Sequence, residues 1–174
     1  MVALMALSNS GGQMLLTTGN KSEMSVGYAT LYGDMAGGYS VLKDAYKTTV
    51  FALSRWRNAN RPENALGPEG PVMPERVITK PPTAELRPGQ KDEDSLPPYS
   101  VLDRILEGLV EKEMSAKEVA NATGEDIALV ADIESKLLKA EYKRRQAPPG
   151  VKIGTRNFGR DRRYPISNFF RTGK

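Results

Sequence analysis

The 174-residue sequence contains no cysteine and no histidine. The first absence excludes disulfides, thiolate metal ligands and cysteine nucleophiles, and the second excludes histidine acid–base catalysis and imidazole metal ligands. The groups that remain for chemistry are carboxylates, lysines, arginines, hydroxyls and backbone amides. These groups suit the binding of phosphates and of a hard metal ion such as Mg²⁺. The two absences therefore point toward nucleotide ligands.

A long hydrophobic run is also absent. The longest apolar stretch, Met1 to Leu7, is too short to cross a bilayer, and it lacks the basic flank and cleavage site of a secretory signal. We therefore expect a cytoplasmic protein without a membrane partner. The hydrophobic content of 39% suffices for one core.

The two ends of the sequence differ in charge. Residues 1–135 carry 13 basic and 19 acidic side chains, whereas residues 136–174 carry 12 basic and 2 acidic ones, a net charge of +10. Such a block binds an anion or an acidic protein surface. Composition alone leaves open whether that partner is a nucleic acid, a phosphate-bearing ligand or another subunit.

The first part of the chain has the pattern of an α/β unit. Residues 1–7 indicate a helix that ends at a turn, and residues 13–18 then predict a short buried strand. A polar turn over 19–23 follows, and a helix is predicted over 24–31. Because ligands bind beyond the carboxyl ends of strands in open α/β sheets, this polar turn is the first candidate for a ligand site.

The next segments alternate between elements and loops. Apolar spacing predicts a helix over about 41–57, followed by a surface excursion over 58–74 that holds four prolines. Residues 75–80 predict one more short strand. A loop rich in proline and charge then runs from Thr83 to Pro98, and a loop of that length is usually functional.

The last third is predicted to be helical. Ser100 with Asp103, and Ser115 with Glu118, have the spacing of capping boxes that start two helices. The first of these helices is predicted to be amphipathic, with one apolar side formed by Leu102, Ile105, Leu109 and Val110. A final helix is predicted over 126–145, and Pro148-Pro149-Gly150 is expected to end it. The remainder is basic and aromatic without periodicity. We therefore divide the chain into a main part, 1–146, and a basic tail of the same domain, 147–174.

A resemblance to a known family rests on one long string and several shorter ones. Residues Thr17 to Tyr28, followed by Tyr32 to Met35, closely resemble the second nucleotide-contacting segment of the NAD⁺ synthetases. The match continues in register through residues 42–48, 81–86, 90–94 and 141–146. The sequences of these segments are most similar to those of the bacterial glutamine-dependent branch, in which a separate amidase domain precedes the synthetase domain.

The resemblance implies a fold and a reaction. The fold is α/β, the C-terminal part of a Rossmann-like domain of the N-type ATP pyrophosphatase (adenine nucleotide alpha hydrolase-like) group, with a helical C-terminal half and usually assembled as a homodimer. The reaction uses ATP and Mg²⁺ to adenylate the carboxylate of deamido-NAD⁺, after which ammonia, drawn from glutamine by the amidase domain, displaces AMP. The protein mainly aligns the reactants and neutralises phosphate charge, so no side-chain nucleophile is required.

The family's functional residues are carried over by position. The residues similar to ATP contacts are Thr18, Lys47 and Thr83. Lys47 is expected to act on the phosphates during catalysis, and Thr83 to belong to a loop that folds over ATP. Glu23 is similar to the acidic residue at the metal and deamido-NAD⁺ site. The residues similar to further deamido-NAD⁺ contacts are Tyr28, Lys143 and Arg144.

The family's phosphate loop, Ser-Gly-Gly-x-Asp-Ser, does not occur in these 174 residues. Ser10-Gly11-Gly12 is followed by Gln13-Met14-Leu15, without the acid and hydroxyl that phosphates and Mg²⁺ need, and we interpret it as a turn. We therefore expect the chain alone to make no NAD⁺. Without a cysteine, it also lacks the nucleophile for glutamine hydrolysis.

Two alternatives stay open. Residues 115–145 have the spacing of a helix-turn-helix, but Glu125, Asp126 and Asp132 would place carboxylates against DNA phosphates, so we predict no nucleic-acid partner. The other alternative is a non-catalytic interaction module that docks through the basic residues 152–174.

Overall fold

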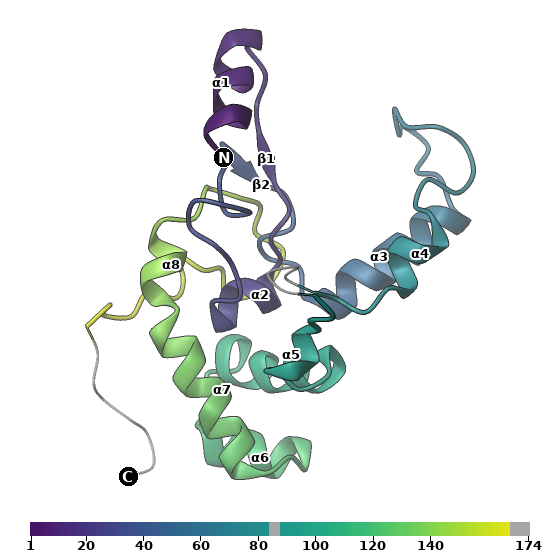
Figure 1. The fold of residues 1–174 in the computed structure, drawn as a ribbon. Helices are drawn as coiled ribbons and strands as arrows, with labels where there is room; N and C mark the ends of the chain where they lie inside the picture. Colours follow the sequence, from purple (N-terminus) through teal and green to yellow (C-terminus); the bar gives the residue numbers. More distant parts are fainter. Residues whose placement is uncertain (84–87, 168–174) are drawn as a thin grey trace.

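The structure is a computed structural model that describes residues 1–83 and 88–167, and it is a mixed α/β chain dominated by helices (Figure 1). Its α-helices are α1 (Val2–Gly11), α2 (Lys21–Val26), α3 (Lys47–Ala59), α4 (Glu75–Thr79), α5 (Tyr99–Leu106), α6 (Ala116–Thr123), α7 (Ile127–Lys139) and α8 (Glu141–Arg145). The strands are β1 (Leu16–Thr17) and β2 (Tyr39–Ser40). A 3₁₀ turn, η1 (Asp92–Asp94), precedes α5, and a π-helical turn, η2 (Glu107–Glu111), continues it.

The hydrophobic core lies between α2, α5, α6 and α7, in the lower half of Figure 1. The amphipathic pattern predicted for the helix that contains α5 is confirmed, because its apolar side chains are buried in this core. The fully buried core side chains are Leu102, Ile105, Leu106, Val110, Val119, Val130, Ile133 and Leu137. This core fixes α2, and α2 carries the polar turn that the sequence indicates as a ligand site.

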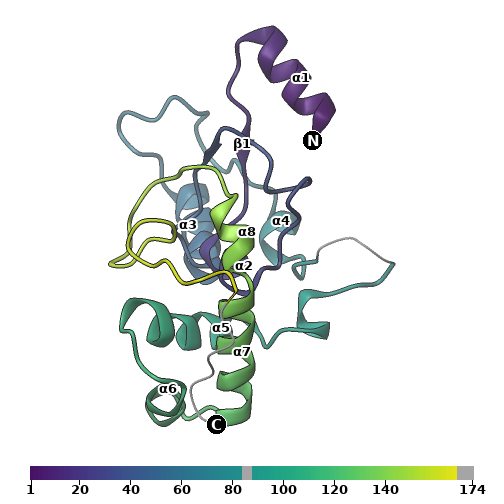
Figure 2. The same ribbon diagram turned by 90° about the vertical axis from the view of Figure 1, so that its left-hand side faces the viewer.

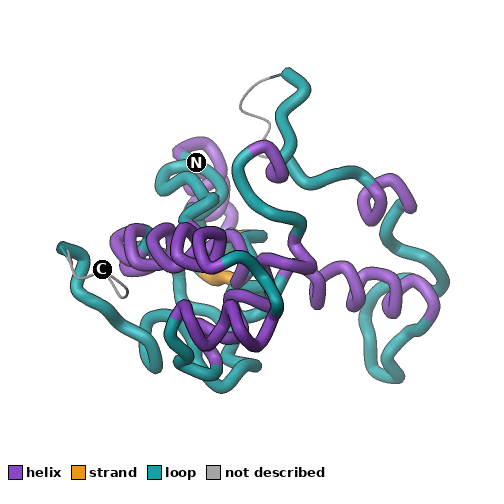
Figure 3. Tube along the Cα trace, turned by 90° about the horizontal axis from the view of Figure 1, so that it is seen from below, coloured by secondary structure: helices purple, strands orange, loops and turns teal. Residues whose placement is uncertain are grey.

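The predicted strand over 13–18 is present only as β1, and it is only half buried. β1 pairs in parallel with β2, with Leu16 opposite Tyr39, and the two strands are the only sheet among the described residues (Figure 3). Thr17 and Ser40 are buried, whereas Leu16, which points to the other face, is 51% exposed. Gly150 forms a bridge to Ser40 on the other side, so the tail begins beside the sheet.

α1 carries apolar side chains but buries none of them in the described structure. It projects away from the helical core (Figure 1) and ends at Gly12, whose φ of 63° is the left-handed conformation that favours glycine. The interpretation of Ser10-Gly11-Gly12 as a turn is therefore confirmed only for Gly12, because Ser10 and Gly11 belong to the last turn of α1. Among the described helices, none is long and apolar enough to cross a membrane.

α2 begins and ends earlier than the predicted range 24–31. Asn20 and Glu23 form a capping box, in which the Asn20 side chain accepts from the Glu23 amide and the Glu23 carboxylate accepts from the Asn20 amide. Gly27, at φ 73°, closes the helix after Val26. The polar turn is thus the first turn of the helix itself, which places Glu23 at its amino end.

Two predicted elements in the middle of the chain are wrong in boundary or type. The helix predicted over 41–57 begins only at Lys47, because Lys43 and Asp44 are buried in contacts with the tail. The strand predicted over 75–80 is instead the helix α4, which packs beside α3 (Figure 1). No strand among the described residues lies where it could pair with this segment. Its β-branched residues therefore form a helix, which begins directly after Pro74.

Of the two predicted capping boxes, one is confirmed and one is wrong. At the start of α6, the Ser115 side chain accepts from the Glu118 amide and the Glu118 carboxylate accepts from the Ser115 amide. α5, however, starts at Tyr99 after Pro98 without a side-chain cap. Asp103 does not cap its own helix; its carboxylate accepts hydrogen bonds from Ser22 and Thr48.

The single helix predicted over 126–145 is divided into α7 and α8. Asp126 caps α7 by accepting from the Ala128 amide, and the helix ends at Ala140. The Arg144 guanidinium donates to the Leu137 carbonyl in the last turn of α7, so a side chain replaces the missing helical donor. Figures 1 and 2 show α7 running from α6 to α8, beside α2.

Candidate functional site

An ion pair joins the starts of two helices. The Lys47 ammonium, in the first turn of α3, donates to Glu23 Oε1 at 2.8 Å. The two side chains are held there by buried contacts between α2, α3 and α5. Ser22 Oγ accepts from the Lys47 amide at 2.8 Å and donates to Asp103 Oδ1 at 2.5 Å. Asp103 also accepts from both the amide and the hydroxyl of Thr48, so it serves as the cap of α3.

A cavity of about 290 Å³ opens beside Lys47. It is lined by Lys47, Phe51, Val77, Lys80, Pro81, Pro82, Thr83 and Asp92. Two of the expected ATP contacts, Lys47 and Thr83, therefore share one cavity although 35 residues separate them in sequence. The volume is at the lower end of the range for small-molecule sites, which suits the phosphate part of a nucleotide. Two lysines give the cavity the charge that an anion requires.

Aromatic rings surround the Lys47 ammonium. It lies 5.4 Å from the centre of the Tyr99 ring and 5.8 Å from that of Phe51, within the range of cation–π attraction. The Tyr99 hydroxyl donates to Asp92 Oδ2 at 2.7 Å. Burial, followed by this hydrogen bond to a carboxylate, raises the pKa of Tyr99 well above its ordinary value, so the hydroxyl stays a donor.

The other expected contacts lie outside this cavity. Thr18 is exposed directly after β1. The Tyr28 hydroxyl accepts from the Gln90 side chain at 3.1 Å, and the Lys143 ammonium donates to the carbonyls of Gly27 and Ala29. Tyr28 and Lys143 are thus brought together at the end of α2. Residues 84–87, part of the loop expected to fold over ATP, lie outside the described residues.

Arg144 is built into the core. It is 3% exposed and donates to the carbonyls of Met24 and Ser25 at 3.2 and 2.9 Å, and to Glu141 at 2.9 Å. Burial lowers the pKa of Arg144 to about 10, against the opposing effect of Glu141. These bonds tie α8 to the end of α2. A contact from Arg144 to deamido-NAD⁺ stays a prediction.

A buried charge network that was not predicted from the sequence surrounds Lys21. The Lys21 ammonium is fully buried; it donates to Asp44 Oδ1 at 2.6 Å, to Glu111 in η2, and to the Arg156 carbonyl at 2.7 Å. The three partners come from the loop before α3, the π-helical turn and the tail. A signal was available, because Lys21 stands inside the polar turn, but the spacing of its partners by 23, 90 and 135 residues is invisible to local patterns.

The network also holds the tail. Asp44 Oδ2 accepts from the amides of Ile153 and Gly154 at 2.7 Å, and Glu111 Oε2 accepts from the Arg156 amide at 2.9 Å. Burial raises the pKa of Glu111, but the hydrogen bonds from Lys21, Thr155 and Arg156 outweigh it and lower that pKa below its ordinary value. Residues 153–156 are therefore packed on the body of the chain.

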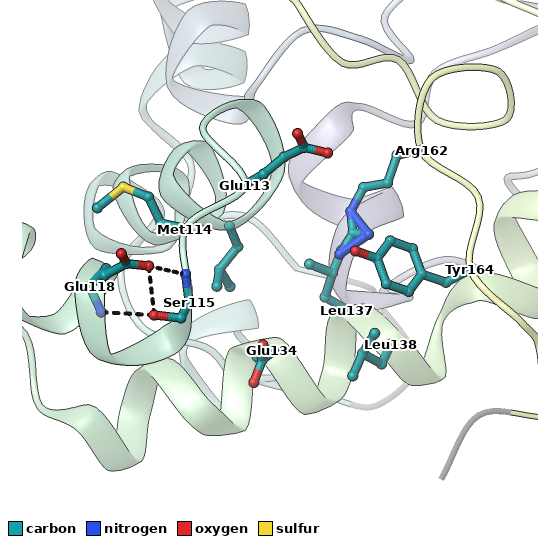
Figure 4. A pocket seen from close by; sticks show the side chains of 10 residues that line it. Glu113, Met114, Ser115, Glu118, Glu134, Leu137, Leu138, Arg162 and Tyr164 are labelled. Atoms are coloured by element: carbon teal, nitrogen blue, oxygen red, sulfur yellow. Dashed lines mark hydrogen bonds between the residues drawn. The ribbon is translucent and has the colours of Figure 1, made fainter. Parts of the chain in front are cut away.

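A second cavity, of about 340 Å³, lies between α7 and the tail (Figure 4). Its walls include Arg162, stacked 4.1 Å from the centre of the Tyr164 ring, and three carboxylates, those of Glu113, Glu118 and Glu134. The acidic lining disfavours a phosphate. The cavity at Lys47 is therefore the better candidate for a nucleotide.

The segment with helix-turn-helix spacing does form two packed helices, α6 and α7. At the amino end of α7, the Glu125 carboxylate accepts from Arg104 at 2.6 Å and the Asp126 carboxylate caps the helix. The carboxylates that would face DNA phosphates thus stand at the end of the helix that would enter a major groove.

Comparison with known proteins decides the family. The model of the NAD synthase family matches residues 1–147. The chain belongs to the NAD synthase family. Two similar relatives are the glutamine-dependent NAD(+) synthetases of Rhodobacter capsulatus, 56% identical over 98% of this chain, and of Thermotoga maritima, 55% identical over 97%. The chain spans 31% and 28% of the length of these NAD synthetases.

The fold agrees with a solved member of the family. The crystal structure of a glutamine-dependent NAD(+) synthetase from Cytophaga hutchinsonii superposes with a TM-score of 0.67 at 25% identity, covering 94% of this chain and 26% of that one. The mixed α/β arrangement is therefore that of a segment of a NAD synthetase.

Proposed function

We propose that this chain is part of an NAD⁺ synthetase and contributes contacts to the ATP phosphates and the metal ion during adenylation of deamido-NAD⁺, while another segment supplies the phosphate loop. The observation that carries the proposal is the cavity shared by Lys47 and Thr83, with Glu23 paired to Lys47 at 2.8 Å. Family membership supplies the reaction class, a ligation of carbon to nitrogen in NAD biosynthesis.

The chemistry needs charge placement more than side-chain nucleophiles. A carboxylate oxygen of deamido-NAD⁺ forms a bond to the α-phosphorus of ATP while the bond to pyrophosphate breaks; ammonia then attacks the acyl carbon and AMP leaves. Negative charge grows on the departing pyrophosphate, and a lysine fixed at that point lowers the barrier. Lys47 is suited to this role because α2 and α5 fix its backbone, while Glu23 and the two rings orient its ammonium.

Mg²⁺ is implied by the family, and the residues present fit part of its coordination. The Glu23 carboxylate forms an ion pair with Lys47. We propose that it can release the Lys47 ammonium and bind a metal cation instead. Groups of three or more metal-ligating side chains are absent from the described residues, so further ligands come from phosphate oxygens and from other parts of the protein. Such an ion would neutralise phosphate charge.

The finer assignments remain predictions. They comprise the Rossmann-like N-type pyrophosphatase topology, a cytoplasmic homodimer, ammonia delivered from glutamine, ATP contact by Thr18, and deamido-NAD⁺ contacts by Tyr28, Lys143 and Arg144. Thr18 lies between β1 and α2, beyond the carboxyl end of a strand, which is where ligands bind in open α/β sheets.

The test joins this chain to the preceding part of the Rhodobacter capsulatus synthetase and measures NAD⁺ formed from deamido-NAD⁺, ATP and ammonia. We expect the joined protein to make NAD⁺ and the 174-residue chain alone to make none, because the chain has no Ser-Gly-Gly-x-Asp-Ser loop. Turnover by the chain alone, on the order of 1 per second, would overturn the expectation that another segment supplies the phosphate loop.

A further inference from the structure

One oxygen of the Asp92 carboxylate lacks a hydrogen-bond partner among the described residues. Asp92 is 4% exposed, and no described donor reaches its Oδ1, whereas Oδ2 accepts from the Tyr99 hydroxyl at 2.7 Å. A buried carboxylate oxygen without a donor or cation is costly, and a bound ion is one way in which such an oxygen is satisfied. Asp92 lines the same cavity as Lys47 and Thr83.

The position of Asp92 is fixed from three directions. Its amide donates to the Pro82 carbonyl at 3.0 Å, next to Thr83, and its own carbonyl accepts from the amides of Ser95 and Leu96. With the bond from Tyr99, these contacts fix Asp92 at the edge of the cavity that it lines. The side chain is therefore preorganised, in contrast to the neighbouring Glu93, which is exposed and outside the cavity.

A carboxylate beside two lysines in one cavity selects among ligands. A bare phosphate would be attracted by Lys47 and Lys80 but repelled by Asp92. A phosphate that carries a divalent cation presents both charges, and carboxylate oxygen is a preferred ligand of Mg²⁺ and Mn²⁺. The cation-bearing phosphate matches the charge of Asp92 as well as that of the two lysines.

We propose that Asp92 is a cation-binding residue of the phosphate cavity, whose Oδ1 binds the divalent ion carried by the phosphates. This inference rests on the proposed function, since it takes the Lys47 cavity as the phosphate site. It adds a ligand that the family resemblance does not supply, and Tyr99 contacts both Asp92, through its hydroxyl, and Lys47, through its ring.

The test uses the 174-residue chain, Mn²⁺ as the cation and inorganic pyrophosphate as the phosphate. Bound Mn²⁺ is counted by the loss of the free-ion electron paramagnetic resonance signal. We expect pyrophosphate to increase Mn²⁺ affinity in the wild type, and Asp92→Asn to weaken Mn²⁺ binding by at least about 10-fold in the presence of pyrophosphate. The amide oxygen of the variant can still accept from Tyr99, so the fold is retained, which circular dichroism checks. Glu93→Gln is the matched control and should bind as the wild type does.

A second readout needs no variant: Mn²⁺ with pyrophosphate should broaden the nuclear magnetic resonance signals of Asp92 more than those of Glu93. Equal Mn²⁺ affinity in Asp92→Asn and wild type, with pyrophosphate still bound, would overturn this inference and leave the proposed function standing. Failure of the wild-type chain to bind pyrophosphate with or without Mn²⁺ would overturn both.

Discussion

Replacing Lys47 by alanine in the joined protein should slow adenylation by about 100- to 1,000-fold, the usual cost of removing a preorganised charge from a transition state. The reason is geometric: the amide of Lys47 is held by Ser22, and its ammonium is oriented by Glu23 and Tyr99, so a freely diffusing cation cannot replace it. Single-turnover formation of the adenylate at saturating ATP measures this step without the contribution of ATP binding.

Two further variants make the result specific. Lys47→Arg keeps the charge but not the compact ammonium, and it should recover only part of the rate. Lys117→Ala, on the exposed surface of α6, is the matched control and should adenylate at the wild-type rate. If Lys47→Ala adenylates at the same rate as the Lys117→Ala control, the assignment of Lys47 to the site is wrong.

Replacing Lys21 by methionine should destabilise the chain by about 3–5 kcal/mol, the range found when one partner of a buried ion pair is removed. The ammonium is fully buried, and without it the carboxylates of Asp44 and Glu111 lose their common counter-charge. Methionine keeps most of the volume, so the loss reports charge and not packing. Urea unfolding followed by circular dichroism measures it.

The matched control is Lys112→Met, which removes an exposed pair with Glu107 and should change stability by no more than about 0.5 kcal/mol. The pH dependence gives an independent check. Because the pKa of Glu111 is lowered in the folded chain, its contribution is present above the ordinary glutamate range and is lost as the pH falls through the lowered value. Lys21→Met should flatten this dependence. Equal stability of the two lysine variants would contradict the role of the network.

Local chemistry made part of the fold predictable. The Ser115–Glu118 box and the buried face of α5 are set by residues three or four positions apart, and both were read correctly from the sequence. The start of α3 was not, because it is decided by Asp103 and Ser22, which lie on other helices. The segment 75–80 was mistaken for a strand because β-branched residues indicate strands only where a neighbouring strand is present to pair with them.

Some residues of the candidate site could likewise be predicted from the sequence, and others could not. The resemblance indicated Lys47 and Thr83 as ATP contacts by position, and the structure brings them to one cavity. Asp92 stood inside a matching segment without a role, because its unpaired oxygen exists only once Tyr99 occupies the other one. The burial of Lys21 could not be predicted, because its partners lie far from it in the sequence.

The central claim is that the Lys47–Thr83 cavity holds phosphate, and its most direct test is a titration of the ¹⁵N-labelled chain with pyrophosphate, followed through amide chemical shifts. Sulfate at equal ionic strength controls for the general attraction of anions to the basic tail. The account predicts saturable shifts at Lys47, Thr83 and Asp92 that sulfate does not reproduce. Shifts that spare these residues, or that centre on Arg162 in the second cavity, would contradict it.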